Sequence, residues 1–273
     1  MPQLAAQISK QDFYQDPRDP KNKRVVVNLS FNYPIDAEDF KKRVVMTLQS
    51  KDAAVLGEKA KSVPFSTSFG KFLNEAYISS DPLEIPKDDM VMRVEIDKGV
   101  HGQFSGQTED KLAAAIAVPG MFNYFKFTQA QVTFARNERY EPEQVLILET
   151  IGEVSSEAVA KSIEVMLLPL ISPDVDAKKN KEKKHYWRST SEVTEAVKAQ
   201  MTPVKLTLIP SEQEATLMHS FKVNMPVGRS LFVKVNHGLK SFGGYELAHD
   251  YLDIVGVPEY PKELLIMSQG SSR

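Results

Sequence analysis

The sequence IAVP at residues 116–119 recurs as VGVP at residues 255–258, an offset of 139 positions (255 minus 116). The strand-like run before it recurs at the same offset. Its matched positions are Val94, Ile96, Gly99 and Val100, which correspond to Val233, Val235, Gly238 and Leu239. Self-similarity at a fixed spacing indicates that one structural unit occurs twice. We therefore predict that the chain contains two copies of one fold.

The starts of the two copies match at a shorter offset of about 120 positions. Residues 30–44 (SFNYPIDAEDFKKRV) and 150–163 (TIGEVSSEAVAKSI) each read as a strand, a polar break, a short helical turn with an acidic start, and a new strand. The second copy therefore holds about 19 extra residues (139 minus 120). Their natural place is about 176–199, where the run KKNKEKK at 178–184 is too charged to pack.

The local pattern is that of β-strands nearly throughout. The run RVVVNLSF at 24–31 follows the turn cluster DPRDP at 16–20 and is rich in β-branched residues. Alternation of apolar and polar residues across 93–96 predicts strands with one face on a core and one in water. We predict an all-β fold of tandem antiparallel β-sandwiches, with short helical turns at 36–42 and 156–162.

The repeat predicts the domain organisation. Residues 1–122 form the first β-sandwich domain, residues 123–258 form the second with its charged insertion at about 176–199, and residues 259–273 form the first strand of a truncated third domain. The junction PGMFNYF at 119–125 is short and aromatic, which predicts a stiff, partly buried joint. Both ends of the chain read as cuts in a longer protein.

Composition narrows the function. The chain has 273 residues, a formal net charge of −2 and a pI of about 6.3. This balance predicts no nucleic-acid partner. The absence of cysteine excludes disulfides, thiolate metal sites, cysteine nucleophiles and a thioester formed by this segment. The sequence contains no run of 18 apolar residues, so no membrane-spanning helix is predicted.

The sequence favours structural roles for the five histidines and for the motif at 102–106. No two histidines have the i, i+4 spacing of a helical metal site, so solvated or structural roles are favoured for His101, His185, His219, His237 and His249. The motif GQFSG at 102–106 differs from a nucleophile elbow because its serine is fourth and no helix follows. It aligns with SFGG at 241–244, so both predict one recurring turn.

The remaining motifs are also assigned to structure. Two carboxylate pairs, Asp88 with Asp89 and Asp250 with Asp253, are assigned to exposed or capping positions. The basic run 178–184 predicts a solvated loop that proteases nick first, in preference to a binding or bait role. Trp187, the only tryptophan, predicts packing of the insertion onto the sandwich. Glycine-rich phosphate motifs are absent. No catalytic, cofactor-binding or metal-binding residue is therefore predicted, and no cofactor.

Several segments together resemble the bacterial α2-macroglobulins. They are FYQDP at 13–17, residues 23–36 and 40–44, LTLIPSE at 206–212, HSF at 219–221, GLKSFGG at 238–244 and residues 257–270. The resemblance covers essentially the whole chain. It implies macroglobulin-like domains, seven-stranded antiparallel sandwiches related to fibronectin type III. The family traps proteases after an exposed bait region is cut, and this chain would be non-enzymatic scaffold.

The resemblance also implies location and partners. The location implied is the periplasm of a Gram-negative bacterium, with inner-membrane association through the missing N-terminus of the parent. The partners implied are target proteases, bound by the full-length parent, neighbouring macroglobulin-like domains and other envelope proteins. A second hypothesis is an adhesin-like or carbohydrate-binding sandwich array, which predicts exposed aromatics or an acidic calcium loop. A third, an enzyme, lacks a catalytic set in this sequence.

Overall fold

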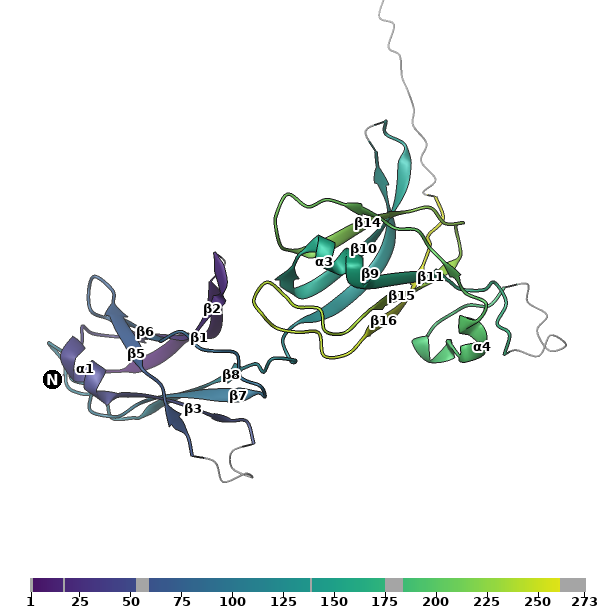
Figure 1. The fold of residues 1–273 in the computed structure, drawn as a ribbon. Coiled ribbons are helices and arrows are strands. Elements are labelled where there is room, and N and C mark those ends of the chain that lie inside the picture. The colour runs from purple at the N-terminus through teal and green to yellow at the C-terminus, as the bar shows by residue number, and fades with distance from the viewer. Residues whose placement is uncertain (1, 17, 53–58, 138, 175–183, 261–273) are drawn as a thin grey trace, which may run out of the picture. The chain divides into compact units, whose positions relative to one another are not determined.

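The computed structural model describes residues 2–16, 18–52, 59–137, 139–174 and 184–260. Contacts divide the chain into two units (Figure 1). Unit 1 comprises Met1–Phe125 with Lys240–Ala248, and unit 2 comprises Lys126–Leu239 with His249–Arg273. The predicted loop at 178–184, apart from Lys184, and nearly all of the predicted strand at 259–273 lie outside the described residues. Among the described residues, no helix is long and apolar enough to cross a membrane.

Unit 1 consists of two four-stranded antiparallel sheets. The first has the order β1 (Ala6–Asp16), β2 (Asp19–Phe31), β6 (Glu75–Ser80), β5 (Phe65–Phe69). The second has the order β4 (Lys61–Ser62), β3 (Val44–Ser50), β7 (Met90–Ile96), β8 (Leu112–Val118). Helix α1 (Ala37–Arg43) connects β2 to β3 and so links the two sheets.

Unit 2 repeats this arrangement. One sheet has the order β13 (Thr207–Ile209), β14 (Thr216–Val223), β10 (Pro142–Val154), β9 (Lys126–Arg136). The other has the order β12 (Thr202–Pro203), β11 (Ile163–Leu167), β15 (Ser230–Val235), β16 (Tyr251–Gly256). Helix α3 (Ser156–Ser162) links β10 to β11, as α1 links β2 to β3. Helices η1 (Thr190–Glu192) and α4 (Glu195–Lys198) lie between β11 and β12.

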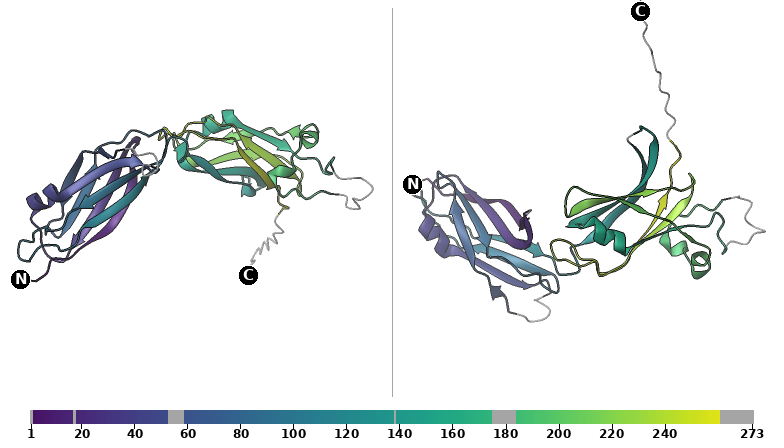
Figure 2. Two further views of the ribbon diagram at one scale, coloured as in Figure 1. Left: turned by 90° about the horizontal axis from the view of Figure 1, so that it is seen from below. Right: turned by 45° about the horizontal axis from the view of Figure 1, so that its top comes forward.

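The all-β class and the antiparallel sandwiches are confirmed, and the two sheets of each unit face each other as layers (Figures 1 and 2). The predicted helical turns are confirmed in α1 and α3. The seven-strand count is not confirmed, because the described residues give each copy eight strands, including the two-residue strands β4 and β12. The copies differ between their third and fourth strands, where the connection spans 168–201 in unit 2 and 51–60 in unit 1.

The core of unit 1 follows from alternation along β2. Val25, Val27, Leu29 and Phe31 point inward and are at most 5% exposed, while the residues between them face outward. Helix α1 adds Phe40, which is fully buried and packs edge-to-face against two phenylalanines, with ring centroids 5.9 and 5.8 Å away. The interior is therefore a continuous apolar layer between the sheets.

Unit 2 has an apolar cluster on the outer face of the sheet β12-β11-β15-β16. Trp187 is 9% exposed and packs in a cluster with Leu168, Val193, Val197 and Phe232. Its indole N–H donates to the carbonyl of Pro169 at 3.0 Å. The predicted packing role of Trp187 is confirmed, and this residue fastens the chain between β11 and β12 to the sheet.

Candidate functional site

A turn at the end of each copy recurs with the same hydrogen bonds. In the first copy, the amide of Gly102 donates to the carbonyl of Gly106 at 3.0 Å, and His101 pairs with Gln107 as a β-bridge. In the second copy, the amide of Ser241 donates to the carbonyl of Tyr245 at 2.8 Å. A β-bridge between residues 240 and 246 completes the match at the offset of 139. The predicted recurring turn is confirmed.

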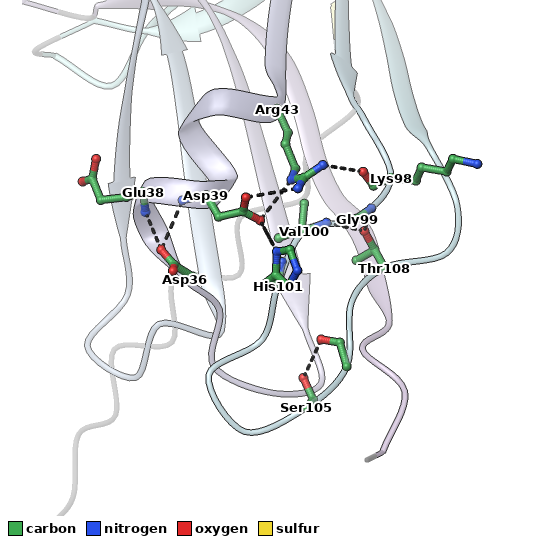
Figure 3. Close-up of polar contacts among 11 residues, drawn as sticks. Asp36, Glu38, Asp39, Arg43, Lys98, Gly99, Val100, His101, Ser105 and Thr108 are labelled. Carbon is green, nitrogen blue, oxygen red and sulfur yellow. Dashed lines mark hydrogen bonds and ion pairs between the residues drawn. The ribbon is translucent and has the colours of Figure 1, made fainter.

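The first turn is held by a carboxylate on α1 (Figure 3). Asp39 accepts hydrogen bonds from the guanidinium of Arg43 at 3.0 and 3.1 Å, from the amide of His101 at 2.9 Å and at 3.0 Å from its Nδ1. Arg43 also donates to the carbonyl of Lys98 at 2.8 Å. Two-pronged pairing of this kind fixes both direction and distance. The group therefore clamps α1 to the base of the turn.

The clamp depends on the charge of Asp39. Partial burial opposes that charge, but the hydrogen bonds from Arg43 and His101 outweigh it and hold the pKa of Asp39 well below its usual range. Below the clamp, the buried hydroxyl oxygen of Thr108 accepts from the amides of Gly99 and Val100 at 3.1 and 3.0 Å. Gly99 has a φ of +89°, a conformation that favours glycine. The base of the turn is thus fixed from both sides.

Asp39, His101 and Ser105 offer the residue types of a hydrolytic triad on one loop system. Asp39 and His101 are hydrogen-bonded as a triad requires. Ser105 does not complete it, since its hydroxyl donates to the carbonyl of Gly106 at 3.5 Å and the side chain is 6% exposed. Figure 3 shows Ser105 in the loop below His101, with its dashed line running to the neighbouring carbonyl and not to the imidazole. The arrangement supports a structural turn, as the sequence predicts.

The second turn contains a different set of contacts. Residues Lys240–Ala248 belong to unit 1, although the strands on both sides of them belong to unit 2. Within unit 1, Nζ of Lys23 donates to the carbonyls of Gly243 at 2.6 Å and Pro20 at 2.7 Å. The same ammonium lies 5.1 Å from the ring centroid of Tyr245, which stacks on Tyr124 at 4.6 Å. The carbonyl of Lys21 lies at 3.4 Å, so three carbonyls and an aromatic face surround one cation.

Lys23 is 1% exposed, and Tyr245 is fully buried. Burial lowers the pKa of Lys23 and raises the pKa of Tyr245, because both charged forms lose hydration. Sequence reasoning missed this lysine. The signal was nonetheless present, since Lys23 shares the inward-facing register of Val25 and Val27 on β2.

The other four histidines have separate surroundings. His185 contacts Glu192 at 2.9 Å and His237 contacts Asp250 at 2.6 Å, while His249 is exposed. Hydrogen bonds from His237 lower the pKa of Asp250 to about 2. His219 is fully buried and contacts the hydroxyl of Ser156 at 3.0 Å, and burial lowers its pKa to about 4.

The predicted carboxylate pairs do not form acid–base sites. Asp89 accepts from the amide of Gly120 and the side chain of Asn123 at 2.9 and 2.8 Å, which caps the turn after β8. Asp253 accepts from the hydroxyl of Tyr251 and the amide of Ile254 at 2.8 Å each. Among the residues that the structure describes, no group of three histidines or carboxylates could hold a metal ion.

A groove of about 540 Å³ lies on the outer face of unit 2. Met166, Met201 and Phe232 supply apolar lining. Two charged residues on its border, Lys234 and Asp250, are paired with each other at 3.4 Å. The groove thus offers an apolar surface, and two of the charged residues that line it already neutralise each other.

Together, the repeated strand order and the two structural turns define the class: a tandem of two antiparallel β-sandwich domains. No family model matches the sequence. The chain is 30% identical to the alpha-2-macroglobulin of Rickettsia conorii, over 97% of this chain and 14% of that protein. It is 27% identical to an alpha-2-macroglobulin homolog of Yersinia pestis and 26% identical to the alpha-2-macroglobulin of Pasteurella multocida, each over 99% of this chain. The predicted resemblance to the bacterial alpha-2-macroglobulins is confirmed over nearly the whole chain.

The chain spans only 13–14% of the length of these relatives. Two solved structures of Escherichia coli alpha-2-macroglobulin also match. A crystal structure spanning domains MG0-NIE-MG1 has 12% identity and a TM-score of 0.29, covering 92% of this chain and 71% of that one. A cryo-EM reconstruction of the native conformation has 11% identity and a TM-score of 0.32, covering 92% and 14%. Scores this low carry no comparison of folds, so the family rests on the sequence relatives.

Proposed function

We propose that this chain is a scaffold segment of a protease-trapping alpha-2-macroglobulin. The observation that carries the proposal is similarity to three alpha-2-macroglobulins across 97–99% of the chain. The chemistry of the described residues supports a scaffold role, because several buried or partly buried polar groups fix turns. Asp39, Thr108 and Lys23 each bond to backbone atoms of the same unit.

The proposal places the reactive parts outside this chain. A thioester requires a cysteine, and this chain contains none. Antiparallel sandwiches with packed cores suit a scaffold, because interiors at crystal-like density resist gradual deformation. In this proposal the sandwiches are the rigid structural support of the trap. The protease cuts elsewhere in the longer protein.

The proposed location is the periplasm, with target proteases as partners of the whole protein. Cell fractionation with antibodies against this segment tests the location. Recovery with periplasmic markers supports it, and recovery with cytosolic markers overturns it. A location in the cytosol would also remove the proposed encounter with invading proteases.

Trapping is tested with the natural-length protein and several proteases of different specificity. Native mass spectrometry should show retained protease after a cut, and the retained enzyme should still cleave small peptides while sparing large proteins. The matched control is the same protease with its active site blocked, which should leave the protein uncut and uncaptured. Uniform digestion without retained protease would contradict the proposal.

A further inference from the structure

The His101–Gln107 turn lies at one end of unit 1 beside two other loops. The amide of Gln103 donates to the carbonyl of Pro34 at 2.9 Å, and the amide of Ile35 donates to the carbonyl of Leu73 at 2.8 Å. These bonds hold the loops around residues 34, 73 and 103 against one another. Each loop also carries an aromatic residue next in sequence to a bonded one.

Those aromatic side chains face solvent. Phe104 and Phe72 are each 72% exposed, and Tyr33 is 36% exposed. Single exposed aromatics are ordinary, but here three lie on loops that are hydrogen-bonded to one another, and grouped exposed apolar side chains mark interaction sites. Aromatic residues are also enriched at protein interfaces. We call this set, Tyr33, Phe72 and Phe104, the aromatic end of unit 1.

The repeat indicates what covers the aromatic end. The second copy of the turn is already seated: Gly243 receives the ammonium of Lys23, and Tyr245 is buried beside Tyr124. Position 243 corresponds to Phe104 at the offset of 139. Gly243 is buried, whereas Phe104 at the matched position is exposed, so this position of the turn is covered in one copy and open in the other.

The segment that leads into each copy also contacts its turn through a backbone hydrogen bond. In the first copy the amide of Gly106 donates to the carbonyl of Pro2 at 2.9 Å, and in the second the amide of Glu246 donates to the carbonyl of Met121 at 3.1 Å. Pro2 and Met121 stand 119 positions apart, the same spacing that separates the starts of α1 and α3. Met121 follows directly on the β-sandwich of unit 1, whose last strand, β8, ends at residue 118. At the offset of 139, Gly106 corresponds to Tyr245, the residue before Glu246, so Pro2 meets the first turn within one residue of the position where Met121 meets the second.

We propose that the aromatic end docks a further β-sandwich domain of the same kind, attached ahead of Pro2 in the longer protein. The clamp of Asp39 on His101 holds the turn in its docking shape without that partner, and such preorganisation lowers the entropy lost on contact. The second copy has no equivalent clamp, because Ala158 and Ser162 occupy the positions of Asp39 and Arg43. The first turn is thus rigid before its partner arrives. This inference depends on the tandem array and not on protease trapping.

A photo-crosslinking amino acid at position 104 of the natural-length protein tests the proposal. The expected product joins position 104 to a sandwich domain that precedes residue 1 in the same chain. A matched control places the same amino acid at Tyr140, which is 78% exposed on unit 2 and should not form this product. Crosslinks from position 104 confined to residues 1–273, crosslinks only to another protein, or no crosslink would each overturn it.

A substitution gives an independent readout. Phe104→Ser should leave the melting temperature of the 273-residue chain unchanged, because the side chain is exposed there. The same substitution should lower the first melting transition of the natural-length protein by several degrees. An equal change in both proteins, or none in the longer one, would show that Phe104 contacts no further domain.

Discussion

Acid should weaken unit 2 through a single buried histidine, and the size of the effect can be worked out from its surroundings. His219 is fully buried, its Nδ1 contacts Ser156, and its Nε2 has no hydrogen-bond partner among the described residues. Burial therefore lowers its pKa from 6.5 to about 4. Above pH 6.5 both the folded and the unfolded chain hold the neutral ring, so this residue adds no pH dependence there.

Below pH 6.5 the imidazole of His219 binds a proton in the unfolded chain but stays neutral in the folded chain. Each pH unit in this window costs about 1.4 kcal/mol of the free energy of unfolding per proton. The loss should reach about 2 kcal/mol at pH 5 and about 3 kcal/mol at pH 4. Carboxylates whose pKa is lowered, such as Asp89 and Glu143, reduce the free energy of unfolding only as the pH falls toward their ordinary pKa values of 3.8 and 4.5. The window from pH 6.5 to 5 is therefore the clearest for His219.

Trp187 makes the measurement specific, because the only tryptophan of the chain lies in unit 2. Urea unfolding followed by its fluorescence should give the predicted slope in the wild type. His219→Gln should remove that slope, since the amide does not titrate, whatever its effect on stability at pH 7. The exposed residue His249 provides the control, and His249→Gln should keep the slope. An unchanged slope in His219→Gln would refute the assignment.

Three predictions concern unit 1 and are read by calorimetry. Asp39→Asn removes the charge that binds Arg43 and should cost about 1–2 kcal/mol, while the exposed neighbour Glu38→Gln should cost little. Equal effects of these two changes would argue against the clamp. Phe40→Ala empties a fully buried ring site and should cost about 3–5 kcal/mol, and a loss below 1 kcal/mol would mean that the site collapses freely. Thr108→Val keeps the shape but leaves the buried amide of Val100 without its acceptor, while the amide of Gly99 keeps the backbone carbonyl of Thr108 at 2.8 Å. A loss of about 1–3 kcal/mol is expected, and a neutral result would contradict that role.

Much of the fold was predictable because the repeat is encoded in residues that pack. Val94 and Val233, or Gly99 and Gly238, occupy matched positions since an inward strand face and a left-handed turn admit few residue types. The strand count was harder to predict. Strands β4 and β12 have two residues each, which is too short for alternation to appear in the sequence.

The site was less predictable because its bonds join distant residues. Asp39 and His101 are 62 positions apart, and Lys23 and Gly243 are 220 positions apart. No local pattern encodes such pairs. Register does carry a weaker signal: Lys23 and His219 both lie on inward-facing positions of their strands, where a polar residue implies a buried partner.

The scaffold role can be tested by locating the first cut that accompanies protease retention. The natural-length protein is incubated with a limiting amount of protease, the complex is isolated, and its peptides are mapped by mass spectrometry. A scaffold segment predicts that the cut which coincides with retention lies outside residues 1–273, and that any nick in the loop at 178–184 occurs without retention. A first cut within residues 1–273 that coincides with retention would contradict the account and make this segment the bait.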